Sequence, residues 1–177
     1  MKNSKIKAGI IGGAGYTGGE TLRLLLLHPK VEIAFVHSKS QAGKPVISVH
    51  HDCLGFTDLK FTNKISKDID VLFLCLGHGE SKKWLLDNSH NLSAKTKIID
   101  LSQDFRHAEN STFKKWKFIY GLPELNKKQI QKADNIANPG CFATCIQLGL
   151  LPLAANKKIL TDVHISATTG STGAGQS

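Results

Sequence analysis

Cys141 is the residue best placed for covalent chemistry, in the run Asn138-Pro139-Gly140-Cys141. The Pro-Gly pair predicts a turn, and the apolar pattern over 141–155 predicts a helix, whose end Pro152 would shorten or kink. Cys141 therefore falls at a predicted helix N-terminus, where unpaired N–H groups and the helix dipole favour the nucleophilic thiolate. Spacing alone supports a buried structural cysteine equally well.

The remaining cysteines, at 53, 75 and 145, predict structural roles. Cys145 lies one helical turn after Cys141 on a predicted apolar stripe, which indicates a core residue. Cys53 and Cys75 have histidines nearby, but at spacings that match no zinc signature. We therefore expect no metal. The four cysteines also fit no disulfide framework, so we expect a cytoplasmic protein.

A second chemical signal is the run Gly13-Ala14-Gly15-Tyr16-Thr17-Gly18, which satisfies G-x-G-x-x-G; Gly12 extends it to a G-x-x-G-x-x-G variant. Such glycines permit a tight strand-to-helix turn and let the backbone approach a pyrophosphate, whose charge then lies at the helix N-terminus. The run follows a predicted strand and precedes a predicted helix. This context favours a dinucleotide site over a merely structural turn.

The end of the next predicted strand indicates which dinucleotide binds. An NAD site typically carries a carboxylate there for the ribose hydroxyls, whereas this strand ends His37-Ser38-Lys39-Ser40. Two hydroxyls and an ammonium suit a 2′-phosphate, so the sequence favours NADP; the alternative is that these residues form an ordinary polar loop. A thiolate beside a nicotinamide would imply acyl chemistry through a thioester.

Strands that alternate with helices must position these groups. The predicted strands span 7–11, 31–36, 70–76, 96–101, 135–137 and 163–168, and the predicted helices span 17–28, 80–88, 126–133 and 141–155. This order predicts an α/β fold of Rossmann type, with a doubly wound, mostly parallel sheet and helices on both faces. A last strand that runs into a glycine-rich turn indicates a fragment. We therefore expect an NADP-binding domain over 1–140, and over 141–177 the cysteine helix and first strand of a truncated α+β domain.

The composition excludes several classes of protein. The chain has 177 residues, with 23 Lys and Arg against 14 Asp and Glu, which gives a net charge of +9. The lysines are scattered rather than clustered, which favours an ordinary solvated surface over a nucleic-acid site. A third possibility is a field that attracts small anionic ligands, and we expect no nucleic-acid partner. The sequence contains no run of 18 apolar residues, which predicts no membrane partner.

These motifs resemble the N-acetyl-gamma-glutamyl-phosphate reductase family, NADP-dependent enzymes of arginine biosynthesis within the aspartate-semialdehyde dehydrogenase superfamily. The matching stretches, in the family's order, are Gly12 to Glu20, the following LRLLLLHPKVEI, His78 to Ser81, Asp100 to Arg106, Tyr120 to Leu125 and Asn138 to Cys141. They extend from the first predicted strand almost to the end of the chain. The last two stretches discriminate best against the aspartate-semialdehyde branch.

The resemblance implies a reaction. Cys141 attacks the gamma-acyl phosphate and expels inorganic phosphate; the thioester takes a hydride from NADPH, and the resulting thiohemiacetal collapses to the semialdehyde. Residues 12–18 would hold the pyrophosphate and residues 38–40 the 2′-phosphate. Gly77, His78 and Gly79 would lie along the cofactor.

The resemblance also points to Arg106 and Asn138 as substrate-binding residues. The Arg106 guanidinium suits a phosphate or a carboxylate, and the open alternative is a structural salt bridge with Asp100 or Asp104. Where family members have an aromatic-Pro-Thr run after the cysteine, this chain has Phe142-Ala143-Thr144.

Family members are also considerably longer, and their second domain supplies a catalytic histidine that His164 does not match. We therefore expect the 177-residue chain to be inactive alone and the full-length form to be a homo-oligomer. Two other functions remain open. One is a reductase of another acyl phosphate, of aspartyl or aminoadipyl type, and the other is a non-catalytic NADP-binding module.

Overall fold

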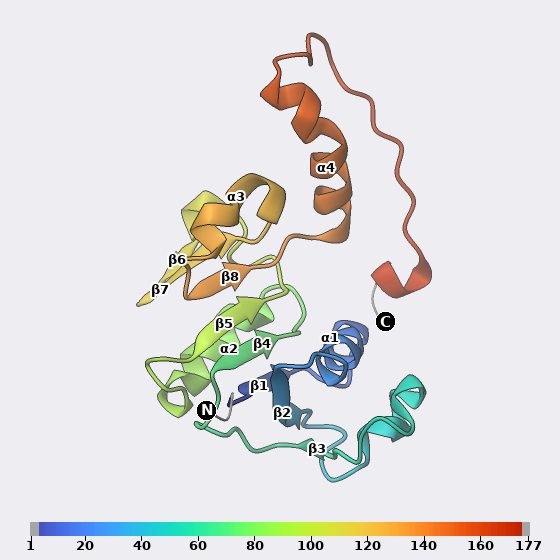
Figure 1. Ribbon diagram of the computed structural model, residues 1–177, viewed down its shortest axis with the longest axis vertical. Coiled ribbons are helices and arrows are strands. Elements are labelled where there is room, and N and C mark those ends of the chain that lie inside the picture. Colours follow the sequence, from blue (N-terminus) through green and yellow to red (C-terminus); the bar gives the residue numbers. More distant parts are fainter. Residues whose placement is uncertain (1–3, 175–177) are drawn as a thin grey trace.

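The computed structural model describes residues 4–174, in which the strands form one sheet (Figure 1). The strands are β1 (Ile6–Ile11), β2 (Val31–His37), β3 (Phe61–Thr62), β4 (Val71–Leu74), β5 (Lys97–Asp100), β6 (Thr112–Phe113), β7 (Trp116–Tyr120) and β8 (Asn135–Ala137). Their order across the sheet is β3-β2-β1-β4-β5-β8-β7-β6. Every pairing is parallel except the β6–β7 hairpin, which confirms the predicted mostly parallel sheet.

Helices cover both faces of this sheet. The α-helices are α1 (Tyr16–Leu26), α2 (Glu80–Asn88), α3 (Pro123–Ile130) and α4 (Cys141–Ala155), and short 3-10 turns lie at 46–48, 51–53, 89–91, 108–110 and 171–174. Successive strand side chains point to opposite faces. Ile10 accordingly shares a core cluster with Leu22 of α1, and Ile11 shares the other cluster with Leu85 of α2.

The turn from β1 to α1 depends on two glycines, Gly12 in the turn and Gly18 in the first turn of α1. Gly12 has φ +76°, and a Cβ there would lie 2.2 Å from the Cys75 carbonyl oxygen. A Cβ on Gly18 would lie 2.4 Å from the Gly12 carbonyl oxygen. Because these neighbours are backbone atoms just after β4 and in the turn itself, a side chain at either position would force the turn open.

Some predicted elements differ from the structure. The strands β3, β6 and β7 were not predicted, although Trp116 and Phe118 of β7 alternate as buried residues with exposed Lys117. The helix predicted over 126–133 is α3, which begins three residues earlier because Pro123 suits the first turn of a helix. Pro152 does not end α4, which continues to Ala155.

The strand predicted over 163–168 is wrong. These residues are exposed and form no ladder, and they belong to a segment that runs beside α4 (Figure 1). A β-branched run becomes a strand only where a neighbouring strand accepts and donates its backbone hydrogen bonds. Within residues 4–174, no strand lies next to this segment.

Candidate cofactor cavity and cysteine loop

A cavity of about 330 Å³ opens where β1 and β2 end. Its lining comes from the glycine turn (Gly12, Ala14, Gly15), the end of β2 (His37, Ser38, Lys39), α2 (Glu80, Lys83, Trp84, Asp87, Asn88) and the strand-end residues Ile11 and Leu76. Within the sheet, β2 lies next to β1 on one side and β4 lies next to β1 on the other, so the strand order reverses at β1. Open α/β sheets bind their ligands at such a switch point, beyond the carboxyl ends of the strands.

Five of the residues predicted to bind the cofactor line this cavity: Gly12, Ala14, Gly15, Ser38 and Lys39. Two further predicted residues, Gly13 and Ser40, do not line the cavity but contact residues that do. The Gly13 N–H donates to the His37 carbonyl at 2.9 Å, and the Ser40 hydroxyl lies 3.4 Å from that of Ser38. Tyr16, Thr17 and Gly18 lie in the first turn of α1 and do not line the cavity.

The predicted loop Gly77 to Gly79 also lies outside the lining, between the lining residues Leu76 and Glu80. His78 is engaged elsewhere, because its Nδ1 accepts a hydrogen bond from the Gln103 N–H at 3.2 Å.

The α2 wall of the cavity was missed by the sequence reasoning. Its members include Glu80, Lys83, Trp84 and Asp87, which recur at the i, i+3, i+4 and i+7 spacing of one helical face. That spacing was available in the sequence. What it could not reveal is that this face turns toward the glycine turn, which depends on the packing of α2 on the sheet.

The cavity carries charges of both signs. Lys39 and Lys83 bring ammonium groups, whereas Glu80 and Asp87 bring carboxylates on the α2 side. Burial, helped by the charge of Lys39, lowers the pKa of His37 below its usual 6.5, so its imidazole is neutral at pH 7. The positive charge at the end of β2 therefore comes from Lys39, next to the buried hydroxyl of Ser38.

A buried carboxylate network anchors the start of α2. Asp100 at the end of β5 accepts hydrogen bonds from the Ser81 and Ser102 hydroxyls, at 2.5 and 2.7 Å. Burial raises the pKa of Asp100, and the two serine donors oppose that shift. Asp104 accepts from the Gly79 and Lys82 N–H groups at 2.6 and 3.0 Å, so it caps the first turn of α2.

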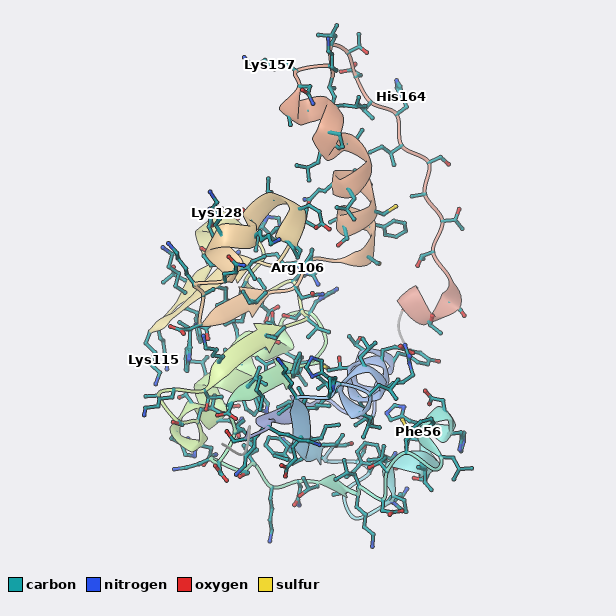
Figure 2. All side chains as sticks on the ribbon, viewed as in Figure 1. Phe56, Arg106, Lys115, Lys128, Lys157 and His164 are labelled. Carbon is teal, nitrogen blue, oxygen red and sulfur yellow. The ribbon has the colours of Figure 1, made fainter. Side chains whose placement is uncertain are left out.

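Arg106 links this network to the cysteine loop. Its Nε donates to the Asn138 carbonyl at 2.8 Å, and its Nη2 donates to the Leu101 carbonyl at 2.7 Å. Figure 2 shows Arg106 near the base of α4, where the loop that follows β8 enters the helix. Within residues 4–174 it forms no ion pair with Asp100 or Asp104, so the salt-bridge alternative is not what the structure contains.

Cys141 is the first residue of α4, with Gly140 as its N-cap, as the sequence predicts. Its thiol is exposed, and the Asn138 N–H donates to the Asp100 carbonyl at 2.7 Å, which ties the preceding loop to β5. The loop and the cavity are separate in this structure, since Cys141 does not line the cavity.

Cys145 is exposed, not buried as predicted. No residue of α4 is buried, and the segment over 163–167 that lines a pocket with this helix covers it only in part. Cys53 and Cys75 are buried, as expected of structural cysteines, and burial raises the pKa of Cys75 to about 11. No three His, Cys, Asp or Glu side chains among the described residues are grouped to hold a metal.

A glycine turn between β1 and α1 that opens on a cavity at the switch point defines a nucleotide-binding domain of Rossmann type. Residues 7–133 match the sequence family described as the semialdehyde dehydrogenase NAD binding domain. The chain therefore belongs to the semialdehyde dehydrogenase family. Residues 141–177 match the description of a semialdehyde dehydrogenase dimerisation domain.

Close relatives share one name. The N-acetyl-gamma-glutamyl-phosphate reductase of Christiangramia forsetii is 56% identical over 172 residues, which are 97% of this chain and 52% of that protein. The protein of the same name from Bacteroides thetaiotaomicron is 56% identical over 171 residues, 96% of this chain and 51% of its own length. The chain thus spans about half the length of the curated relatives it matches.

Solved structures support the fold. Aspartate semialdehyde dehydrogenase II from Vibrio cholerae superposes with a TM-score of 0.65 at 19% identity, covering 86% of this chain and 43% of that one. The Candida albicans aspartate semialdehyde dehydrogenase with NADP gives a TM-score of 0.57 at 18% identity, covering 88% and 48%. Within the described residues, no helix has the length and apolar character needed to cross a membrane.

Proposed function

We propose that this chain is the cofactor-binding part, with the nucleophilic cysteine, of an NADPH-dependent N-acetyl-gamma-glutamyl-phosphate reductase. The reaction releases inorganic phosphate and yields N-acetylglutamate semialdehyde. The observation that carries the proposal is the 56% identity to a reductase of that name over 97% of this chain. That span takes in both the glycine turn and the cysteine loop.

The residues of the cavity fit a phosphorylated dinucleotide. The glycine turn offers backbone N–H groups to a pyrophosphate, and Ser38 and Lys39 offer a hydroxyl and an ammonium to a 2′-phosphate. No carboxylate lies at the end of β2 to repel that phosphate. When bound, NADPH supplies the hydride that reduces the acyl group.

The cysteine loop performs the covalent step of this proposal. The Cys141 thiolate attacks the acyl carbon, the C–O bond to phosphate breaks, and inorganic phosphate leaves with the electron pair. The acyl group then remains on Cys141 as a thioester, and after reduction the sulfur leaves as the thiolate when the aldehyde forms. Arg106 keeps the loop in place through the Asn138 carbonyl and has N–H groups left over for an anionic substrate.

The decisive test is an assay of the complete gene product with NADPH and a panel of acyl phosphates. We expect reduction of N-acetyl-gamma-glutamyl phosphate, with Cys141→Ser inactive and Cys145→Ser active. A preference for aspartyl or aminoadipyl phosphate would instead identify a different reductase. The 177-residue chain alone is expected to bind NADPH without turnover.

A non-catalytic NADP-binding module is the second candidate, because Cys141 lies outside the cavity. Iodoacetamide kinetics against pH separate the two functions. Alkylation of Cys141 that follows a pKa below ~8.5, the value of a free thiol, supports the reductase. If no cysteine titrates below that value, the module is the better description.

Further parts of the proposal concern the whole protein. We infer a cytoplasmic homo-oligomer, supported by the dimerisation-domain match over 141–177. Its positive charge would serve small phosphorylated ligands rather than nucleic acid. Light scattering of the complete gene product tests the oligomer, and a monomer would contradict it.

A further inference from the structure

His50 contacts the glycine turn without lining the cavity. Its Nε2 lies 2.7 Å from the Gly13 carbonyl oxygen. Because a carbonyl oxygen can only accept, Nε2 carries the hydrogen and the imidazole is the donor. His50 itself comes from the segment between two 3-10 turns, and its own N–H donates to the Val46 carbonyl at 3.0 Å.

The hydrogen bond from His50 fixes the direction of the next N–H. In a planar trans peptide, the C=O and the N–H that follows point in opposite directions. With the Gly13 carbonyl turned toward His50, the Ala14 N–H is turned away from it, and Ala14 lines the cavity.

The neighbouring amides of the turn have partners within the protein. The Gly13 N–H donates to the His37 carbonyl at 2.9 Å, and the Gly15 N–H donates to the Gly12 carbonyl at 3.2 Å. The Ala14 N–H has no acceptor among residues 4–174. It is therefore an amide that the turn leaves free for a ligand, as are the first N–H groups of α1.

The His50 ring is held firmly in place. A Cβ on Gly19 would come within 2.5 Å of the ring, so the imidazole lies directly on the backbone of α1. The Phe61 ring lies on another side, with its centroid 6.1 Å away and its plane inclined at 62°. A ring confined in this way holds the Gly13 carbonyl in one orientation.

We propose that His50 is a positioning residue of the cofactor site, which holds the Gly13–Ala14 peptide so that the Ala14 N–H faces a pyrophosphate oxygen. This role rests on the proposed function, because it assumes that the glycine turn receives a dinucleotide. It assigns a task to a histidine outside the cavity lining, on a segment that carries no nucleotide-binding motif.

The test compares two ligands and two substitutions in the 177-residue chain. NADPH has a pyrophosphate, whereas adenosine 2′-monophosphate has only the phosphate assigned to Ser38 and Lys39. His50→Leu is expected to weaken the binding of NADPH about tenfold, the usual effect of losing a hydrogen bond to a charged group. The affinity for adenosine 2′-monophosphate is expected to change by less than about twofold. His50→Gln, whose amide N–H can replace Nε2–H, is expected to restore NADPH binding.

The control is His51→Leu, which removes the exposed neighbouring imidazole and is expected to leave both affinities unchanged. If His50→Leu does not fold, Gly19→Ala decides, because its new methyl group displaces the ring and is expected to cause the same selective loss. Equal loss of both ligands would show a merely structural role and overturn the inference, as would unchanged NADPH binding. A wild-type chain that binds no NADPH would overturn the proposed function, and this inference with it.

Discussion

Lys39 tests the cofactor assignment at the scale of a single residue. Its ammonium lines the cavity beside Ser38, where a 2′-phosphate would lie. We expect Lys39→Ala to weaken the binding of NADPH about tenfold, because a charged hydrogen bond to the phosphate is lost. The affinity for NADH should change by less than about twofold. Fluorescence titration of both cofactors measures this.

The matched control is Lys44→Ala, which removes a nearby lysine that bonds to Gln41 and does not line the cavity. We expect it to leave both cofactors unaffected. Equal weakening of NADPH and NADH by Lys39→Ala would refute the 2′-phosphate assignment.

His37 is expected to make the stability depend on pH. Burial, together with Lys39, lowers its pKa in the folded chain below 6.5, so the unfolded chain binds more protons as the pH falls through 6.5. The contribution to stability is complete above that pH and is lost on acidification below it. We expect the free energy of unfolding in urea to fall less between pH 7.5 and 5.5 in His37→Gln than in the wild type.

His51→Gln, which removes an exposed imidazole, is the comparison for His37→Gln and should keep the wild-type pH dependence. A His37→Gln variant with the same pH dependence as the wild type would show that His37 is not the group responsible.

Local signals found part of the candidate site from the sequence, and tertiary contacts made the rest. The glycine turn, Ser38, Lys39 and the helix start at Cys141 each follow from a short stretch of chain. His50 lies 37 positions along the sequence from the Gly13 carbonyl that it contacts, and no pattern in the residues around it predicts that contact. The sequence predicts that Arg106 binds the substrate. Its hydrogen bonds to the Leu101 and Asn138 carbonyls could not be predicted, because they depend on where β5 and β8 end.

At the scale of elements, we expect a Gly→Ala substitution to have opposite effects at two positions in helices. A Cβ on Gly149 in α4 meets nothing within 4 Å, so Gly149→Ala is expected to favour the helix by up to ~1 kcal/mol. A Cβ on Gly18 in α1 would collide with the Gly12 carbonyl and the Gly13 Cα, at 2.4 and 2.7 Å. Gly18→Ala should therefore lower the free energy of unfolding by ~1–3 kcal/mol, as overpacking does.

Far-UV circular dichroism and urea unfolding of both glycine variants measure these effects. Gly149→Ala should increase the helical signal and Gly18→Ala should lower the urea midpoint. A Gly18→Ala chain as stable as the wild type would mean that the turn can relax without cost, contrary to the close packing described above.

Elements with a strong local pattern were predictable, and elements made by pairing were not. The βαβ unit at the start, α2, β8 and the bounds of α4 agree with the sequence, because apolar periodicity, Gly and Pro mark them. β3 and β6 have two residues each and exist only through their neighbours. Residues 163–168 have the β-branched composition of a strand but lack a partner, which is why composition alone misled.

At the scale of the whole molecule, stability is expected to be uneven. The core clusters lie on the two faces of the sheet, whereas α4, which extends away from the sheet (Figure 1), has no buried residue. A 15-residue helix that buries no residue has little tertiary packing to stabilise it and is marginal in water. In hydrogen exchange, we therefore expect the amides of β1, β4 and β5 to be protected and those of α4 to exchange orders of magnitude faster.

Protection of α4 equal to that of the sheet would contradict this expectation and would mean that another surface covers the helix. Repeating the exchange at several protein concentrations identifies a second copy as that surface, because its protection would then rise with concentration.

The place of β8 determines the order in which the molecule can be completed during synthesis. Among residues 4–174, β8 is the last strand in sequence order, yet it lies between β5 and β7, and β7 reaches the rest of the sheet through it. A nascent chain that ends before Asn135 can join β2, β1, β4 and β5, but it leaves the β6–β7 hairpin without a place in the sheet. Because Cys141 follows β8 after a three-residue loop, the ribosome releases the Cys141 thiol only after the strand that joins the two parts of the sheet.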